Sequence, residues 1–490
     1  LADFNQAFLN LRRRFTERGV FEMEMKLAIL EDIHTTVDLH GLAHVRSAGL
    51  NSGKACLEGT RRKTLDELIS WINNPDAARV RFLLGGAGTG KSSVAHSIGV
   101  YFKALRRLGS FFCFDRAFQG DRHPETVFST IARDLANWNS DFRRTLAEVL
   151  RGQRELGEFK DIAAQWEWLI VKPLQQVSLV GPVLIVIDAF DECSSDARSR
   201  RLLLKHLTEG SAHLPSNVRV LITSRSEPDV KRVVNRHGVH PHTSHVILDD
   251  DHTEAAVDIK HYLRHELAPV DPETEAALDD TYIQKLADKA EGLFQWAATA
   301  CRIILEKPSG RTLKERFDSR LGAVLSGGAS SLDDLYRGIL EQLFDSSDEG
   351  LMERFCSVMA QILCASSPLS VQSLDEKRRL ATGAQEEANL ILADMGSLLM
   401  GVYKQTTPIR PHHTSFRDFL IDEDRSQKWF VDLSKGHPVM ALGCFRVMNK
   451  HPSFNICRMD TSYLPNCDIP DLEARLREFV PGSLSYAACS

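Results

Sequence analysis

The stretch Arg79–Ser92 reads RVRFLLGGAGTGKS, and it decides the fold. Its first half is a short apolar run of branched and aromatic residues, which predicts a buried strand. Its second half, GGAGTGKS, fits GxxxxGK[ST] at every position and is followed by the helical pattern KSSVAHSIGVYFKAL. A glycine-rich loop between a strand and a helix is the context of a P-loop, where backbone N–H groups and the helix N-terminus surround a phosphate. We therefore predict a nucleotide site; a glycine-rich turn without a ligand is the alternative.

This loop and the residue after it supply the predicted nucleotide-binding residues: Gly85, Gly86, Ala87, Gly88, Thr89, Gly90, Lys91, Ser92 and Ser93. Lys91 is expected to reach the β- and γ-phosphates, and the Ser92 hydroxyl to bind Mg²⁺. The ion also needs a carboxylate from the end of a neighbouring strand, and Asp188, which ends the run PVLIVID, meets that need. We therefore expect ATP or ADP with Mg²⁺, and Ser92 and Asp188 as the metal ligands.

Three charged residues are candidates for catalysis. Asp191 and Glu192 follow the strand that ends at Asp188. Carboxylates that crowd one site raise one another's pKa, which suits one of them to orient or deprotonate a water; a solvated helix cap is the alternative. Arg225 follows the run VRVLITS, and an arginine beside a P-loop can contact a γ-phosphate and distinguish triphosphate from diphosphate.

Short apolar runs alternate with helical patterns from residue 79 to residue 249. These runs are RVRFLLG (79–85), SFFCF (110–114), PVLIVID (182–188), VRVLITS (218–224) and HVILD (245–249). Near-continuous apolar strands between helices predict an α/β fold with a parallel sheet covered on both faces. Beyond residue 252 the pattern is helical, and DHTEAAVDIKHYLRHEL (251–267) and YIQKLADKAEGLFQWAATACRII (282–304) each predict a helix. LSGGASS (325–331) predicts a linker.

The composition is that of a folded protein of about three domains at its 490 residues. The net charge of −6 argues against a surface for nucleic acid. No apolar run approaches the ~18 residues of a membrane span, and no secretory leader is visible. The ten cysteines are scattered singly, which is typical of reduced thiols and favours a cytoplasmic location. Because the chain opens at Leu1, we expect it to be a piece of a longer protein.

The P-loop, DAFDE (188–192) and TSR (223–225), in this order, resemble the NACHT group of STAND nucleotide-switch proteins, particularly the large fungal families. The nephrocystin-like N-terminal domain is the same kind of unit. The resemblance runs from CLEGTR (56–61) to FNICRMDTSYL (454–464) and implies the strand order 5-1-4-3-2, followed by a helical domain and a winged-helix domain. The implied division is an N-terminal helical segment (1–50), a nucleotide-binding α/β domain (51–252), a helical domain (253–325), a winged-helix-like domain (326–425) and the start of a C-terminal helical region (426–490).

The resemblance also implies roles for residues outside the P-loop. CLEGTR would lie near the adenine. GLFQWA (292–297) resembles the motif that caps the base, although relatives outside the group often have a proline where this chain has Leu293-Phe294; a buried helix face is the alternative. His413, in HTSFRDFL (413–420), would contact the β-phosphate of ADP; the alternative is that it only flanks core residues.

The sequence therefore predicts a nucleotide-controlled signalling switch. ADP with Mg²⁺ would bridge the sheet domain and the winged helix in a closed state, exchange for ATP would open the protein for self-association, and slow hydrolysis would reset it. The alternatives are a multiple-turnover ATPase and a non-catalytic scaffold with structural nucleotide. DNA binding through the winged helix is disfavoured by the acidic balance. In such proteins repeats beyond the helical region sense the activating ligand, which stays unidentified here. Two helices over about 2–18 and 20–38 are either the tail of an effector domain or a segment packed on the nucleotide domain.

Overall fold

The computed structural model describes most of the chain from residue 39 onward. The described residues are 39, 42–152, 161–193, 196–234, 242–248, 252–268, 278–306, 311–322, 331–383, 387–451, 455–459, 461, 463, 469 and 471–489. The two helices expected over about 2–18 and 20–38 lie outside them.

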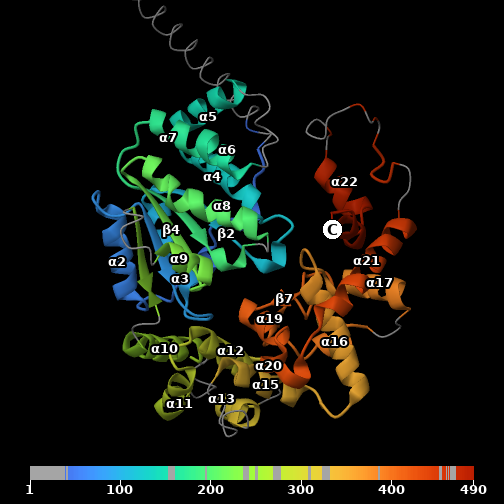
Figure 1. The fold of residues 1–490 in the computed structure, drawn as a ribbon. Coiled ribbons are helices and arrows are strands. Elements are labelled where there is room, and N and C mark those ends of the chain that lie inside the picture. The colour runs from blue at the N-terminus through green and yellow to red at the C-terminus, as the bar shows by residue number, and fades with distance from the viewer. Residues whose placement is uncertain are drawn as a thin grey trace, which may run out of the picture.

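A five-stranded sheet carries the motifs of the nucleotide site (Figure 1). Its strands are β1 (Val80–Leu84), β2 (Leu108–Cys113), β3 (Val183–Asp188), β4 (Val218–Ser224) and β5 (Thr243–Ile247). They pair in parallel in the order β2-β3-β4-β1-β5, which confirms the predicted order 5-1-4-3-2. β5 begins two residues before the predicted run because Thr243 pairs with Val80 at the start of β1. The ends of β1, β3 and β4 lie side by side at one edge.

Helices cover both faces of this sheet because its side chains alternate between two apolar cores. On one face, α2 (Arg62–Asn73) and α3 (Lys91–Ala104) bury residues against Leu83, Val186 and Leu221. On the other face, α4 (Pro124–Trp138) and α8 (Ala197–Thr208) pack against the alternate residues of the same strands. The other helices of this part are α5 (Ser140–Gly152), α6 (Ile162–Gln165), α7 (Lys172–Gln176) and α9 (Pro228–Val234).

Helices dominate after the sheet, as predicted, but one prediction is wrong. The expected helix over 282–304 is two helices, α11 (Asp280–Ala290) and α12 (Phe294–Leu305). The chain breaks between them because Glu291 and Gly292 take the left-handed backbone values φ +45° and +83°. The neighbouring helices are α10 (His252–Glu266) and α13 (Leu313–Arg316).

A winged-helix arrangement of three helices and an antiparallel pair follows. It consists of α16 (Glu349–Cys364), α17 (Val371–Thr382), α18 (Asn389–Leu392), β6 (Leu399–Met400) and β7 (Arg410–Pro411). The remaining helices are α15 (Leu332–Leu343), α19 (Thr414–Leu420), α20 (Glu423–Ser426), α21 (Leu433–Lys450), α22 (Leu472–Phe479) and α23 (Gly482–Cys489). One continuous core runs from Ile259 in α10 to Met440 in α21, so the boundary expected near residue 325 stays a prediction.

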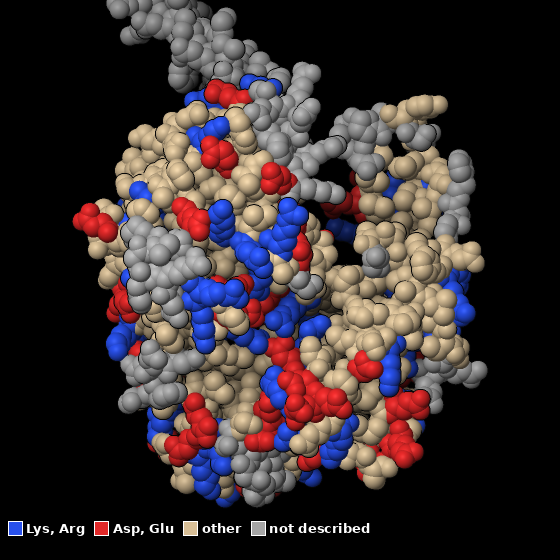
Figure 2. Space-filling model, in the orientation of Figure 1, with Lys and Arg blue, Asp and Glu red and all other residues tan. Residues whose placement is uncertain are grey.

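The sheet-bearing part and the C-terminal helices meet around α19 and diverge toward α22 (Figure 1). Figure 2 shows a hollow between them on this face, and charged side chains of both signs on either side of it. In the described part of the chain, no helix combines the length and the apolar character that crossing a membrane requires.

Candidate nucleotide-binding site

A cavity of 760 Å³ lies where three parts of the chain meet. Its walls come from the P-loop and the ends of β3 and β4, from Tyr262 and Phe294 in the helices after the sheet, and from residues 409–414 beside the wing. This volume falls within the range of about 300–1,000 Å³ that is usual for small-molecule and cofactor sites. A ligand in this cavity would therefore contact all three parts at once.

The P-loop forms the floor of the cavity between β1 and α3. Its cavity-lining residues are Ala87, Gly88, Gly90, Lys91, Ser92 and Ser93. Gly88 and Gly90 have φ of +83° and +94°, values that glycine adopts without a steric penalty. The ammonium of Lys91 donates to the backbone oxygens of Gly85 and Gly86 at 2.9 and 2.6 Å. The Thr89 hydroxyl also donates to the backbone oxygen of Gly86, at 3.1 Å. The side chains of Lys91 and Thr89 thus hold the backbone of the loop in place.

The GLFQWA motif contacts the P-loop directly. The backbone N–H of Gln295 donates to the oxygen of Gly88 at 3.0 Å. A Cβ added to Gly88 would lie 2.6 Å from the Cβ of Gln295, so the two segments are in close contact. Phe294 and Gln295 also line the cavity, while Trp296 and Ala297 are buried. Part of the motif therefore faces the cavity and part is a buried helix face, while contact with the base stays a prediction.

Replacing Gly88 with Ala is expected to destabilise the protein through two effects. The positive φ costs about 1–3 kcal/mol for any residue with a Cβ. The overlap with Gln295 adds about 1–3 kcal/mol because α12 must move away from the P-loop. Gly383→Ala is the matched control, since Gly383 has φ +73° but no atom within 4 Å of an added Cβ. The midpoint of urea denaturation should be clearly lower for Gly88→Ala than for Gly383→Ala. Equal midpoints would contradict the close contact between Gly88 and Gln295.

Asp188 lies fully buried at the end of β3, and both of its carboxylate oxygens accept hydrogen bonds. The hydroxyl of Thr223 at the end of β4 donates to Oδ1 at 2.5 Å, and the thiol of Cys113 donates to Oδ2 at 3.3 Å. After Asp188 the chain turns at Ala189, whose φ of +56° is rare for a residue with a side chain. Its N–H donates to the same Thr223 hydroxyl at 2.8 Å. The TSR segment therefore holds the DAFDE segment in place.

Ser92 and Asp188 line the same cavity as Lys91. A hydroxyl and a carboxylate are the hard oxygen ligands that Mg²⁺ prefers, so this donor set fits the expected ion. His96 and Cys113 also lie near Asp188, and one ligand atom of each falls within 4.8 Å of the others. Nδ1 of His96 accepts the N–H of Asn51 at 3.2 Å, so Nε2 carries the ring proton and offers no lone pair to a metal. The neighbours of Asp188 therefore do not favour a softer metal.

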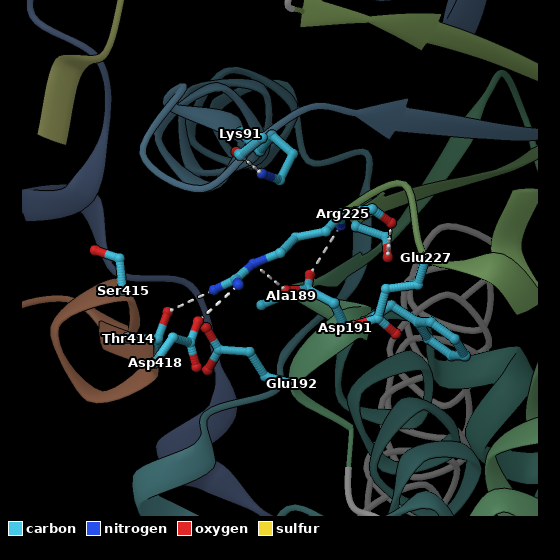
Figure 3. Close-up of polar contacts among 12 residues, drawn as sticks. Lys91, Ala189, Asp191, Glu192, Arg225, Glu227, Thr414, Ser415 and Asp418 are labelled. Atoms are coloured by element: carbon cyan, nitrogen blue, oxygen red, sulfur yellow. Dashed lines mark hydrogen bonds and ion pairs between the residues drawn. The ribbon is translucent and has the colours of Figure 1, made fainter. Parts of the chain in front are cut away.

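Asp191, Glu192 and Arg225 gather at the carboxyl edge of the sheet (Figure 3). Arg225 donates to Asp191 twice, from Nε at 3.0 Å and from its backbone N–H at 3.1 Å. Burial, followed by the charges of Asp191 and Asp115, raises the pKa of Glu192 to about 8. Asp191 is thus held in an ion pair, and the raised pKa makes Glu192 the candidate for accepting a proton near neutral pH.

Asp418 in α19 joins the C-terminal part to this cluster. Its Oδ1 accepts from Nη1 of Arg116 at 2.7 Å, and its Oδ2 accepts from Nη1 of Arg225 at 2.6 Å. The Thr414 hydroxyl lies 3.3 Å from Nη2 of Arg225. Figure 3 shows the Arg225 side chain extending from the sheet edge toward α19, where Thr414 and Asp418 meet it. The Asp418 carboxylate therefore forms ion pairs with two arginines that line the cavity.

His413 lies at the N-cap of α19 and lines the cavity. Its Nδ1 accepts the N–H of Ser415 at 3.1 Å, so the ring proton of the neutral imidazole sits on Nε2. Burial, followed by the charges of Arg225 and Lys91, lowers the pKa of His413 to about 3. The imidazole is therefore a neutral N–H donor beside two cationic side chains.

Several residues of the site were not singled out in the sequence. Arg116 follows β2 at the carboxyl edge of the sheet, and that position was a signal that could have found it. Asp418 lies inside the quoted HTSFRDFL segment, but its arginine partners are far away in sequence. Arg61, in CLEGTR, is buried and donates to the Thr89 oxygen at 2.8 Å, while its guanidinium lies 5.0 Å from the centre of the Phe294 ring. Arg61 therefore stabilises the P-loop, in addition to lying in the segment that was expected near the adenine.

Comparisons with known proteins identify one domain. Residues 59–225, about a third of the chain, match the family model for the N-terminal domain of nephrocystin 3. No curated protein matches the chain significantly.

Solved structures resemble the chain only distantly. A STAND protein with a tetratricopeptide repeat sensor from Pyrococcus horikoshii is 16% identical at a TM-score of 0.39, over 89% of this chain and 56% of that one. The chain thus spans about half the length of that protein. Cdc6p from Pyrobaculum aerophilum is 15% identical at a TM-score of 0.35, over 81% of this chain and 98% of that one. DnaA bound to AMPPCP, from Aquifex aeolicus, is 14% identical at a TM-score of 0.32, over 80% of this chain and 97% of that one. Residues 59–225 are therefore similar to the N-terminal domain of nephrocystin 3, and in this chain they hold the P-loop and four strands of the parallel sheet.

Proposed function

We propose that the chain is a NACHT-type STAND signalling switch that binds ATP or ADP with Mg²⁺ and changes its assembly with the nucleotide state. One observation carries the proposal: the P-loop and residues 409–414 line one cavity. A nucleotide in this cavity contacts both the sheet and the winged helix, so its identity can bias their relative position. ATP drives opening only as far as its affinity differs between the closed and open states.

The side chains around the cavity divide into two groups by chemistry. Ser92 and Asp188 supply oxygen ligands for Mg²⁺, whose charge neutralises phosphate oxygens when it is bound. Lys91 and Arg225 supply positive charge, and His413 supplies a neutral N–H donor. This combination of positive charge, an N–H donor and oxygen ligands for Mg²⁺ in one cavity supports a polyphosphate ligand.

The contacts of Arg225 support slow hydrolysis in the closed state. The guanidinium that would bind a γ-phosphate is held by Asp191 and Asp418. Glu192 is the proposed base, because its pKa near 8 lets it accept a proton from water, whereas Asp191 is committed to the ion pair. Release of Asp418 would free Arg225 for the substrate, so opening and hydrolysis are coupled in this proposal.

The decisive experiment identifies the nucleotide that the purified chain retains. We expect ADP, released on denaturation and measured by chromatography, and a larger assembly when ADP is replaced by a non-hydrolysable ATP analogue with Mg²⁺. Lys91→Ala is the control and is expected to lose both the retained nucleotide and the assembly. An empty wild-type site that ignores added Mg-ATP would overturn the proposal. A Lys91→Ala protein that is less stable, with no size difference between ADP and ATP in the wild type, would favour a scaffold with structural nucleotide.

A multiple-turnover ATPase is the second candidate, and the clustered carboxylates Asp188, Asp191 and Glu192 favour it. Steady-state turnover separates the two functions. A rate around ~10 s⁻¹, typical of enzymes, would favour the ATPase, while less than about one turnover per minute would favour the switch.

A further inference from the structure

A chain of buried hydroxyl groups leads from α15 to His413. Tyr336 in α15 is 1% exposed, and its hydroxyl lies 2.8 Å from the hydroxyl of Ser415. The Ser415 hydroxyl lies 2.6 Å from Nδ1 of His413. These short contacts connect the side chain that faces the cavity to the core of the C-terminal part.

The hydrogen-bond network assigns a direction to this chain. Nδ1 of His413 already accepts the backbone N–H of Ser415, so it carries no proton and the Ser415 hydroxyl must donate to it. Because Ser415 has only one hydroxyl proton, its oxygen accepts from the Tyr336 hydroxyl. Every donor therefore points toward His413, and the ring proton is left on Nε2.

The relay Tyr336–Ser415–His413 thus spans α15 and α19, and its His413 end lies at the cavity.

We propose that Tyr336 is a positioning residue for nucleoside diphosphate binding, which through Ser415 holds His413 as an Nε2–H donor to the terminal phosphate. The proposal rests on the proposed function. A tautomer with its proton on Nδ1 would turn an imidazole lone pair toward the anion, and the two would repel. Donors in a chain also polarise one another, which strengthens the last N–H in the series.

A double-mutant cycle tests the relay on the full chain, with ADP affinity measured by calorimetry. Tyr336→Phe removes only the hydroxyl and keeps the ring, which packs against Phe416 and Phe419 at centroid distances of 5.1 and 5.7 Å. We expect an ADP affinity loss of about fivefold in the wild-type background, the usual effect of one neutral hydrogen bond. In a His413→Ala background the same substitution should change ADP affinity by less than about twofold, because its target is gone.

Two further variants complete the design. Ser415→Ala cuts the relay one residue later, so it should reproduce the loss and add nothing when combined with Tyr336→Phe. Tyr282→Phe is the matched control, since Tyr282 packs on Phe317 outside the relay, and it should leave ADP affinity unchanged.

The outcomes separate the relay from the function on which it rests. Equal losses from Tyr336→Phe with and without His413 would mean a general packing effect and would overturn the relay, as would no loss in either background. In both cases wild-type ADP binding would leave the proposed function standing. A wild-type protein that binds no ADP would overturn both.

Discussion

Replacing Glu192 with Gln is expected to slow ATP hydrolysis by about 100-fold or more, while Mg-ATP affinity stays within about twofold. The amide keeps the shape of the side chain but cannot take a proton from water. The half-buried position of Glu192 and its contact with the N–H of Arg116 at 3.1 Å should survive, because the remaining amide oxygen can accept that bond. Single-turnover hydrolysis and equilibrium binding measured on one preparation separate the two effects.

The matched control is Glu227→Gln. Glu227 lies close to Arg225 in sequence, but it pairs with Arg200 at 2.6 Å. This substitution should leave the single-turnover rate near the wild-type value. Loss of hydrolysis in Glu227→Gln, or normal hydrolysis in Glu192→Gln, would remove Glu192 from the role of base.

The same assignment predicts the pH profile. Because the pKa of Glu192 is raised to about 8, the carboxyl group is mostly protonated at pH 6 and 7 and cannot act as a base. The hydrolysis rate should therefore rise about tenfold per pH unit between pH 6 and 7 and level off above pH 8. In Glu192→Gln the residual rate should show no such rise. A flat wild-type profile over this interval would contradict the assignment.

Local sequence predicted the parts of the site that neighbours in the chain determine. The P-loop, Asp188 and Arg225 each stand at the end of an apolar run, and parallel strands bring their carboxyl ends to one edge of a sheet. The strand order itself came from the resemblance, because hydrophobic periodicity does not specify which strands pair. The break at Glu291 escaped prediction because apolar residues continue at helical spacing on both sides of it.

The contacts that close the cavity depend on residues far apart in the chain. Arg116 and Asp418 are separated by 302 positions, and only the packing of α19 against the sheet edge pairs them. The hydroxyl relay likewise joins Tyr336 to Ser415 across 79 positions. No local pattern marks such pairs, because an isolated arginine or tyrosine looks the same in a surface helix.

Replacing Asp418 with Asn is expected to shift the protein from its closed form toward its open form by about 30-fold. Asn keeps the volume of the side chain but leaves Arg116 and Arg225 without the carboxylate they share. Losing one partner of a buried charge pair costs about 2–5 kcal/mol. The side chain of Asp418 is 12% exposed and the two arginines are 21% and 25% exposed, so solvent screening favours the lower end. About 2 kcal/mol corresponds to the 30-fold shift.

The two nucleotides should respond to Asp418→Asn in opposite directions. ADP binds the closed form in the proposed switch, so opening lowers its apparent affinity, whereas ATP brings negative charge that Arg116 and Arg225 can now accept. Size-exclusion chromatography with light scattering should show assembly at a lower ATP-analogue concentration than for the wild type. Asp424→Asn, an exposed change on the neighbouring α20, should behave as the wild type. If Asp418→Asn weakened ADP and ATP-analogue binding equally, the carboxylate would only join the two parts of the protein and would not compete with the phosphate. A purely structural contact does not discriminate between ligands that differ by one charged group.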